Sequence, residues 1–195
     1  MLLRRCGTDA LLVEVDSLSE VAAVRAALEH LDGIEELVPA ARTVLVKGAL
    51  PQVRDALKTI DLTKTPAKHS REITIPVIYD GPDLALVAET AGVTPDEVVE
   101  LHTTATYEVA FCGFAPGFGY LTGLPQALRQ PRLDSPRTKV PQGSVGIAGE
   151  FTAAYPRPTP GGWRLIGRTE TTLFDPKAET PALLQPGDQV RFVVA

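Results

Sequence analysis

The 195-residue chain is 44% hydrophobic and 22% charged, the balance of a globular protein rather than a disordered one. Its 16 glycines and 17 prolines follow no triplet period, which excludes collagen, and no apolar run approaches the ~20 residues of a membrane helix. Arginines stand where a signal peptide would be apolar, so we expect a cytoplasmic protein that does not contact membranes. Two cysteines are too few for a disulfide scaffold or a four-cysteine zinc site, and we expect no metal.

The net charge of −5 is unevenly distributed along the chain. Residues 129–168 carry seven basic and two acidic groups, whereas residues 71–128 carry one basic and eight acidic groups. A basic segment in an acidic protein can attract an anionic ligand, although a surface loop with solvated arginines explains the same pattern. The chain is not basic overall and has no platform of basic and aromatic residues, so nucleic acid is not an expected partner.

The first third of the chain predicts a small α/β domain. A strand is expected over residues 10–15, and the capping box of Ser17 and Glu20 begins a helix whose apolar residues recur to Leu31 before Gly33. Two strands and a second helix starting at Pro51 follow, which gives the order β-α-β-β-α, close to a split βαβ sandwich. The polar residues 63–71 indicate a linker, so we expect domains over 1–70 and 71–195.

The rest of the chain predicts short strands separated by turns. Pro76 suggests that the strand over residues 73–79 lies at a sheet edge or contains a bulge. A short helix ends at Gly92, and a second capping box, Thr94 with Glu97, begins another helix. Together with the first domain this predicts an α+β fold. Four further strands are expected, over residues 107–112, 145–148, 163–168 and 190–194.

Residues 113–121, with the sequence GFAPGFGYL, follow one of these strands. Glycines permit unusual backbone angles and close approach, and Pro116 stiffens the turn. The aromatic side chains of Phe114, Phe118 and Tyr120 could wall a pocket, although an ordered structural loop would look the same. No Gly-Lys-Ser/Thr follows, so the segment is not a phosphate-binding loop.

Two basic motifs follow, over residues 136–149 and 155–169. In an extended chain, side chains two residues apart point to the same side, so the cations of each motif lie together and suit a carboxylate or a phosphate ligand. Alternatively, these charges only protect an edge strand from pairing with another chain. The candidate anion-binding residues are therefore Arg137, Lys139, Arg164 and Arg168. The candidate pocket-lining residues are Phe114, Pro116, Phe118, Tyr120, Gln142, Tyr155 and Trp163.

No catalytic residue can be assigned from a motif. The sequence contains neither a Gly-x-Ser-x-Gly elbow nor a His-Glu-x-x-His pair. His102 lies near the end of a predicted helix, where we expect it to interact with the helix dipole. Cys112 ends an apolar strand and is expected to be a small buried hydrophobe rather than a nucleophile.

Five stretches in this order, YEVAFCGFAPGFGYL, PRTKVPQGSVGIAGEFTAAYP, PGGWRLIGRT, LFDP and LLQPGDQVRF, resemble the allophanate hydrolase subunit 1 family. This family includes the kinase inhibitor KipI and the B subunit of the prokaryotic ATP-dependent 5-oxoprolinase. The resemblance covers about residues 8–195 and implies a small N-terminal α/β domain followed by a cyclophilin-like β-barrel. It also implies a partner of the allophanate hydrolase subunit 2 family, such as KipA or the C subunit of 5-oxoprolinase, and possibly the A subunit of 5-oxoprolinase.

The activity that the resemblance implies is the cleavage of 5-oxo-L-proline to L-glutamate with ATP hydrolysis, or a related allophanate-hydrolase-like reaction. The complex, rather than this chain alone, would use ATP. Phosphorylation of the lactam oxygen depends on positioning the reactants and neutralising the phosphate charge more than on a protein nucleophile. The chain alone is expected to be inactive, and a heterotetramer with two copies of each subunit is expected. The alternatives are a KipI-like inhibitor of a sensor histidine kinase and, more weakly, a proline-binding module.

Overall fold

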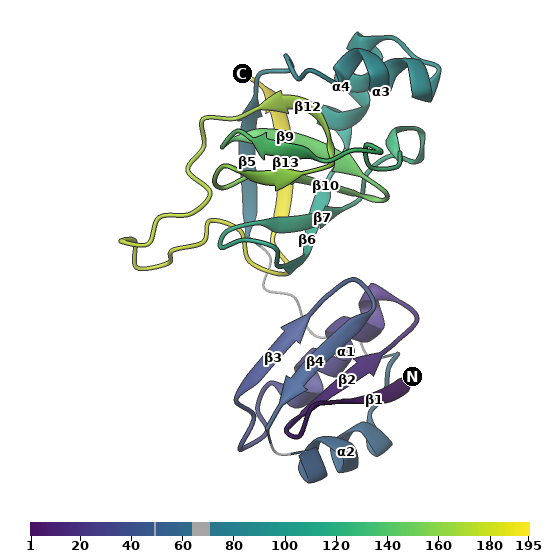
Figure 1. The fold of residues 1–195 in the computed structure, drawn as a ribbon, viewed down its shortest axis with the longest axis vertical. Coiled ribbons are helices and arrows are strands. Elements are labelled where there is room, and N and C mark those ends of the chain that lie inside the picture. The colour runs from purple at the N-terminus through teal and green to yellow at the C-terminus, as the bar shows by residue number, and fades with distance from the viewer. Residues whose placement is uncertain (49, 64–70) are drawn as a thin grey trace. The chain divides into compact units, whose positions relative to one another are not determined.

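The chain divides into two compact units, Met1–Lys68 and His69–Ala195, in a computed structural model that describes residues 1–48, 50–63 and 71–195 (Figure 1). We call them the first and the second unit. The predicted domain boundary at residue 70 lies outside the described residues, as does most of the linker predicted over residues 63–71.

The first unit is a four-stranded antiparallel sheet with the strand order β1-β2-β4-β3. The predicted order β-α-β-β-α is correct but incomplete, because an additional edge strand precedes it. The unit is therefore a split-βαβ-like sandwich whose outer strand comes first in the chain. Its elements are β1 (Leu2–Cys6), β2 (Ala10–Glu14), α1 (Leu18–Leu28), β3 (Glu36–Pro39), β4 (Thr43–Lys47) and α2 (Leu50–Thr59).

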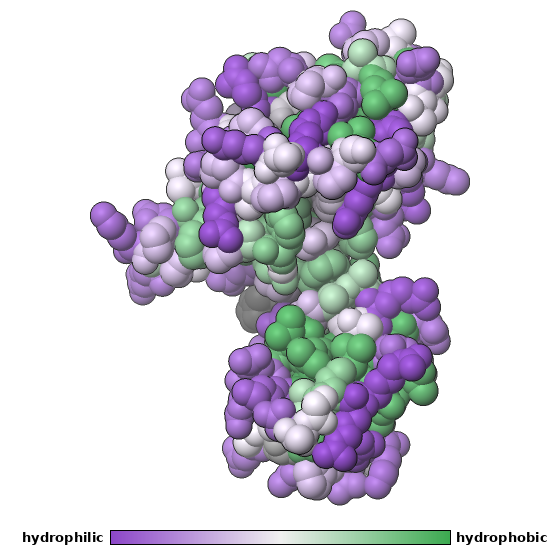
Figure 2. All heavy atoms as spheres, in the orientation of Figure 1, coloured by the Kyte–Doolittle hydropathy of each residue, from purple (hydrophilic) through white to green (hydrophobic). Residues whose placement is uncertain are grey.

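Alternation along the strands separates the two faces of this sheet. On β2 and β4 every second side chain is fully buried, and these side chains pack with apolar residues of both helices in one aliphatic core. On the opposite face Leu12 pairs with Leu45, which pairs with the exposed Val38, and Figure 2 shows hydrophobic residues gathered on part of this unit's surface. Helix α1 begins at the predicted cap but ends at Leu28, before the predicted stop at Gly33.

The second unit is a nearly closed, seven-stranded barrel with the strand order β12-β9-β10-β7-β6-β13-β5, beside a separate two-stranded ribbon of β8 and β11. The predicted α+β class with a barrel-like second part is confirmed. Its strands are β5 (Glu72–Val77), β6 (Tyr107–Cys112), β7 (Gly119–Thr122), β8 (Arg137–Val140), β9 (Ser144–Ala148), β10 (Phe151–Ala154), β11 (Thr159–Gly161), β12 (Arg164–Arg168) and β13 (Gln189–Val194).

Two helices of the second unit follow β5 in the chain and lie together at one end of the barrel, and a short 3-10 helix follows β7 (Figure 1). They are α3 (Leu84–Ala91), α4 (Pro95–Thr104) and the short 3-10 helix η1 (Gln126–Leu128). The capping box predicted at α4 is present, because the Thr94 hydroxyl accepts from the Glu97 amide and the Glu97 carboxylate accepts from the Thr94 amide. Strands β7, β8, β10 and β11 lie in the segment predicted to consist mainly of turns.

The barrel closes along a seam between the segment after β5 and strand β12. Ile78 and Arg168 exchange two backbone hydrogen bonds, and the amides of Gly81 and Asp83 donate to the carbonyls of Ile166 and Leu165. A Cβ atom on Gly81 would lie 2.3 Å from the Leu165 carbonyl oxygen, so this approach requires glycine. Strand β5 pairs in parallel with β13 and forms the edge of the sheet, as Pro76 predicted.

Candidate functional site

Seven aromatic rings of the second unit form one connected group, which we call the aromatic cluster. Phe118 lies at its centre, with ring centroids 5.0 Å from Tyr120, 5.2 Å from Tyr155 and 5.6 Å from Trp163. The segments predicted to carry the site therefore come together in the fold, although they are up to 50 residues apart in the chain. The members are Phe111, Phe114, Phe118, Tyr120, Phe151, Tyr155 and Trp163.

The loop between β6 and β7 holds Phe114 in an unusual conformation. Phe114 has φ +66° and is 58% exposed, and its ring packs edge-on against Phe118 at 5.2 Å. The amides of Gly113 and Phe118 each donate within the loop, which fixes the turn. A left-handed backbone is costly for a residue with a side chain, and such strain collects at functional sites. The loop thus presents a rigid, exposed aromatic ring.

The other predicted pocket residues differ in exposure. Phe118, Tyr155 and Trp163 are 5% exposed or less and fill the core behind the surface. Tyr120 is half-buried, whereas Pro116 and Gln142 are exposed. Burial raises the pKa of Tyr155 to about 12, although the nearby guanidinium groups of Arg132 and Arg137 act in the opposite direction. The Tyr155 hydroxyl therefore stays protonated at physiological pH.

Arg137, the first predicted anion-binding residue, already holds a carboxylate of the protein. One guanidinium nitrogen lies 2.7 and 2.8 Å from the two carboxylate oxygens of Asp83, and another donates to the Trp163 carbonyl at 3.3 Å. The Asp83 carboxylate also accepts from the Leu165 amide at 2.6 Å. This arrangement joins β8, the start of α3 and β12. The guanidinium is occupied as a structural group, so it does not present a vacant two-point anion site.

Arg164 and Arg168 are also engaged. Arg164 donates to the Thr90 hydroxyl of α3 at 2.8 Å and to the side-chain oxygen of Gln130, and its Nε is buried without a partner among the described residues. Arg168 forms an ion pair with Asp80 at 2.9 Å. Lys139 is exposed on β8, and no carboxylate of the described residues pairs with it. The four predicted cations therefore do not form one open cluster.

Arg132 was missed from the sequence because it falls outside both basic motifs. Burial raises the pKa of the Tyr120 hydroxyl, and Arg132 opposes this shift as it does at Tyr155. Arg132 is therefore electrostatically close to two hydroxyl groups of the aromatic cluster. Among the described residues no carboxylate forms an ion pair with it.

His102 does not interact with the helix dipole as a cation, so that prediction is wrong. The side chain is fully buried, with Nδ1 2.7 Å from the Tyr79 hydroxyl and Nε2 3.0 Å from the Thr152 hydroxyl. Its ring stacks on Phe192 at 4.6 Å. Burial lowers the pKa of His102 to about 3, so the imidazole is neutral and inaccessible to a substrate. Cys112 is half-buried at the end of β6.

Comparison with known proteins places this arrangement in a family. The family model described as "carboxyltransferase domain, subdomain C and D" matches residues 1–184. The chain belongs to this carboxyltransferase-domain family. The resemblance to the allophanate hydrolase subunit 1 and KipI family, drawn from the sequence motifs, is confirmed by this match and by the relatives.

Two curated relatives of this carboxyltransferase-domain chain carry the name of the B subunit of 5-oxoprolinase. The one from Escherichia coli O157:H7 is 45% identical over 175 residues, which are 85% of this chain and 80% of the relative. The one from Bacillus subtilis (strain 168) is 49% identical over 128 residues, which are 64% of this chain and 53% of the relative. A crystal structure of TTHA0988 superposes with a TM-score of 0.83 and 34% identity, over 96% of this chain and 40% of that one.

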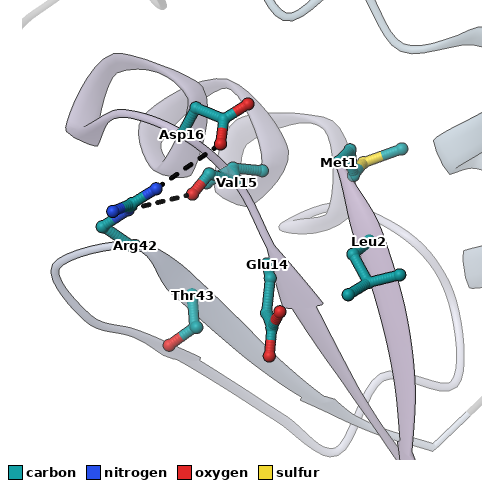
Figure 3. Close-up of a pocket in the computed structure, with 7 residues that line it drawn as sticks. All are labelled: Met1, Leu2, Glu14, Val15, Asp16, Arg42 and Thr43. Carbon is teal, nitrogen blue, oxygen red and sulfur yellow. Dashed lines mark hydrogen bonds and ion pairs between the residues drawn. The ribbon is translucent and has the colours of Figure 1, made fainter.

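Other features of this carboxyltransferase-domain protein are less suited to binding chemistry. A hollow of about 370 Å³ in the first unit is lined by Met1, Leu2, Glu14, Val15, Asp16, Arg42 and Thr43 (Figure 3). The Arg42 guanidinium donates to the Asp16 carboxylate and the Val15 carbonyl, so this cation is already engaged. Within residues 1–48, 50–63 and 71–195, no three His, Cys, Asp or Glu side chains gather to hold a metal. No helix in these ranges has the length and apolarity to span a membrane.

Proposed function

We propose that the chain is the B subunit of an ATP-dependent 5-oxoprolinase, which cleaves 5-oxo-L-proline to L-glutamate together with other subunits. The 45% identity to the relative of that name, over 80% of its length, is the observation that carries the proposal. The chain spans 53% of the second curated relative and 40% of the matching crystal structure, so the activity of a whole assembly is inferred. No observation on the described residues favours the alternative role as a kinase inhibitor.

The residues of the site support a role in binding rather than in nucleophilic attack. Both nitrogens of His102 are occupied by hydroxyl groups in the core, so this histidine is not a base that a substrate reaches. The aromatic cluster offers an apolar surface, and exposed cations lie on the same unit. A lactam carbonyl needs activation before water attacks it, and we infer that the other subunits contribute that step.

ATP does not fit this chain as its own ligand. A triphosphate needs several unoccupied cations or a cradle of backbone amides. Three of the predicted cations are held by groups of the protein, Arg137 by Asp83, Arg164 by Gln130 and Arg168 by Asp80. We therefore place ATP elsewhere in the assembled complex and derive no step through it here.

Phe114 is our candidate for contact with the subunit 2 partner. The ring is 58% exposed yet held by Phe118 and Tyr155 at its edge, so it loses little freedom when a partner covers it. Rigid aromatic side chains of this kind dominate the binding free energy of protein interfaces. A pocket of apolar side chains on the partner would bury the exposed Phe114 ring.

Co-expression with homologues of subunit 2 and of the A subunit of 5-oxoprolinase tests this function. We expect a stable complex that releases ADP only when 5-oxo-L-proline is present, and background release from the chain alone. Phe114→Ser is expected to weaken complex formation by at least ~10-fold, since the ring is the exposed anchor. Light scattering during size-exclusion chromatography measures the complex, and a coupled ADP assay measures turnover.

Leu86→Ser is the matched control, because Leu86 is also an exposed apolar residue of the second unit but lies on α3. It should leave the complex intact. An assembled complex that shows no turnover of 5-oxo-L-proline would contradict the proposed function. Unchanged association of the Phe114 variant would remove that residue from the interface.

A further inference from the structure

The predicted cations are tied to partners of their own, which leaves the question of where this unit could bind a small anion. Arg137 holds Asp83, Arg168 holds Asp80, and Arg164 is hydrogen-bonded to Gln130 and Thr90. Arg132 is exposed and has no carboxylate partner among the described residues. It is therefore an arginine of this region that is free to receive an anionic ligand.

The backbone places Arg132 at the aromatic cluster. The amide of the next residue, Leu133, donates to the Gly162 carbonyl at 2.7 Å. Gly162 lies directly before Trp163, and a Cβ atom on its neighbour Gly161 would lie 2.7 Å from the Tyr155 hydroxyl oxygen. The chain at residue 132 is thus fixed beside the two glycines that border the cluster. The influence of Arg132 on the pKa values of Tyr120 and Tyr155 agrees with this position.

Tyr120 supplies a hydrogen-bond donor at the same place. Its ring is clamped by Phe111 at 4.4 Å and by Trp163 at 5.7 Å, so the direction of the hydroxyl is fixed by packing. The residue is half-buried, and among the described residues the hydroxyl has no hydrogen-bond partner. Burial raises the pKa of Tyr120, so the hydroxyl keeps its proton and can donate to an anion.

We propose that the Arg132 guanidinium and the Tyr120 hydroxyl bind the carboxylate of the small substrate at the edge of the aromatic cluster. The planar fork of arginine can contact both oxygens of a carboxylate, and a charge-assisted bond of this kind is stronger than a neutral one. The half-buried rings of Tyr120 and Phe151, which pack against each other, offer an apolar surface to the ring of a lactam. This assignment rests on the proposed function, because it takes 5-oxo-L-proline as the ligand.

Lys139 is the competing cation, and the structure favours Arg132. Lys139 is exposed on β8. A lysine there would bind an anion as a point charge, without the planar fork of an arginine. Arg132 and Tyr120 together supply two kinds of donor from fixed positions. They can therefore bind the carboxylate and also orient the small ring that carries it.

Trp163 makes this site measurable without turnover. It is the single tryptophan of the chain and lies in the aromatic cluster, so its fluorescence should respond to a ligand bound there. We expect a saturable change when the full chain is titrated with L-5-oxoproline. 2-Pyrrolidinone, which is the same ring without the carboxylate, should give a response at least ~10-fold weaker because it loses the charge-assisted bond.

Two substitutions separate the binding groups. Arg132→Ala should weaken L-5-oxoproline binding by at least ~10-fold, and Tyr120→Phe by ~3-fold, since the second change removes one hydrogen bond from an uncharged donor. Arg191→Ala is the control, because Arg191 is exposed on β13 and paired with Glu72 away from the cluster. All three variants should keep the wild-type melting temperature within about 2 °C, since two of the changed side chains are exposed and the third keeps its ring.

The experiments test the carboxylate site of Arg132 and Tyr120 independently of the proposed 5-oxoprolinase function. In the assembled complex, Arg132→Ala should raise KM for 5-oxo-L-proline with a smaller change in kcat, because the carboxylate is remote from the bond that breaks. Wild-type KM and wild-type fluorescence titration in the Arg132 variant would overturn this site and leave the proposed function intact. The absence of a saturable wild-type response would also overturn it. A complex without turnover overturns the proposed function, whereas the titration still tests the carboxylate site.

Discussion

The two units of this chain are built from different kinds of side chain. The single tryptophan, the four tyrosines and the six phenylalanines all lie in the second unit. The core of the first unit consists of leucine, isoleucine, valine and alanine. Every buried polar or charged residue that the described ranges contain also lies in the second unit, namely Asp83, His102, Gln130, Ser144, Thr152, Thr169 and Asp188.

The two units therefore differ in what stabilises them and in which of them carries reactive or binding groups. An aliphatic core is held by burial of apolar surface, which is non-directional and nearly independent of pH. A buried polar group requires its partner, because an unpaired one costs free energy in a medium of low polarity. The second unit therefore depends on particular charges and protonation states, and it is also the unit that carries the candidate binding residues.

The largest change in the free energy of unfolding is expected when the ion pair of Arg137 and Asp83 is broken. Arg137→Ala should lower the free energy of unfolding by about 3 kcal/mol, because it leaves the Asp83 carboxylate buried without its cation. Arg168→Ala should cost less than ~1 kcal/mol, since both members of its pair with Asp80 are about half exposed. Urea unfolding followed by Trp163 fluorescence measures both. Equal losses in the two variants would show that burial of Asp83 does not set the cost.

The second effect is a dependence on pH. The folded state holds the pKa of His102 at about 3, whereas an unfolded histidine has a pKa of about 6.5. Both states are neutral at pH 7. As the pH falls below 6.5 only the unfolded state takes up the proton, so stability is lost, by about 2 kcal/mol between pH 7 and pH 5.

Urea unfolding at several pH values, again followed through Trp163, measures this loss. His102→Gln removes the titrating group and keeps a side chain that can meet the Tyr79 and Thr152 hydroxyls, so its stability should change little between pH 7 and pH 5. An equal loss in this variant and in the wild type would assign the pH dependence to other groups.

The smallest effect is expected for the surface ion pairs of the first unit. Arg4→Ala breaks the pair with Glu14 across β1 and β2, but both side chains are accessible to water. We expect a change of less than ~0.5 kcal/mol, since exposed pairs contribute little. Circular dichroism at 222 nm during urea unfolding is the measurement. A loss above ~1.5 kcal/mol would show that the first unit also depends on individual charges.

The strands with regular alternation and the helices with capping residues were predictable from the sequence. Thr94 and Glu97 form both bonds of their predicted box, and Pro76 lies on an edge strand. Strand β1 was missed because its Arg4 and Arg5 interrupt the apolar pattern, and its position depends on pairing with β2. Strands β7, β8, β10 and β11 were missed for a related reason, since the glycines and prolines of this part of the chain indicate turns unless long-range pairing is known.

The sequence indicated which segments and residue types meet at the candidate site. It did not indicate which side chains contact one another there. The sequence nominated Arg137 as a residue that binds an anionic ligand, whereas in the structure its guanidinium contacts the carboxylate of Asp83, 54 residues away. Arg132 had no motif to mark it, because its relation to Tyr120 arises from the fold. The role of His102 also depended on distant residues, Tyr79 and Thr152, which no local pattern connects to it.

The seam of the barrel also sets the order in which its backbone amides become accessible to solvent deuterium. Six ladders join the seven strands in order, whereas the two outer strands β5 and β12 meet through the bonds at Ile78, Gly81 and Asp83. Local opening along this line breaks these four backbone hydrogen bonds and leaves all six ladders of the sheet intact. The amides of these three residues and of Arg168 should therefore exchange ahead of those in β6, β9 and β13, and the barrel should unroll from this line.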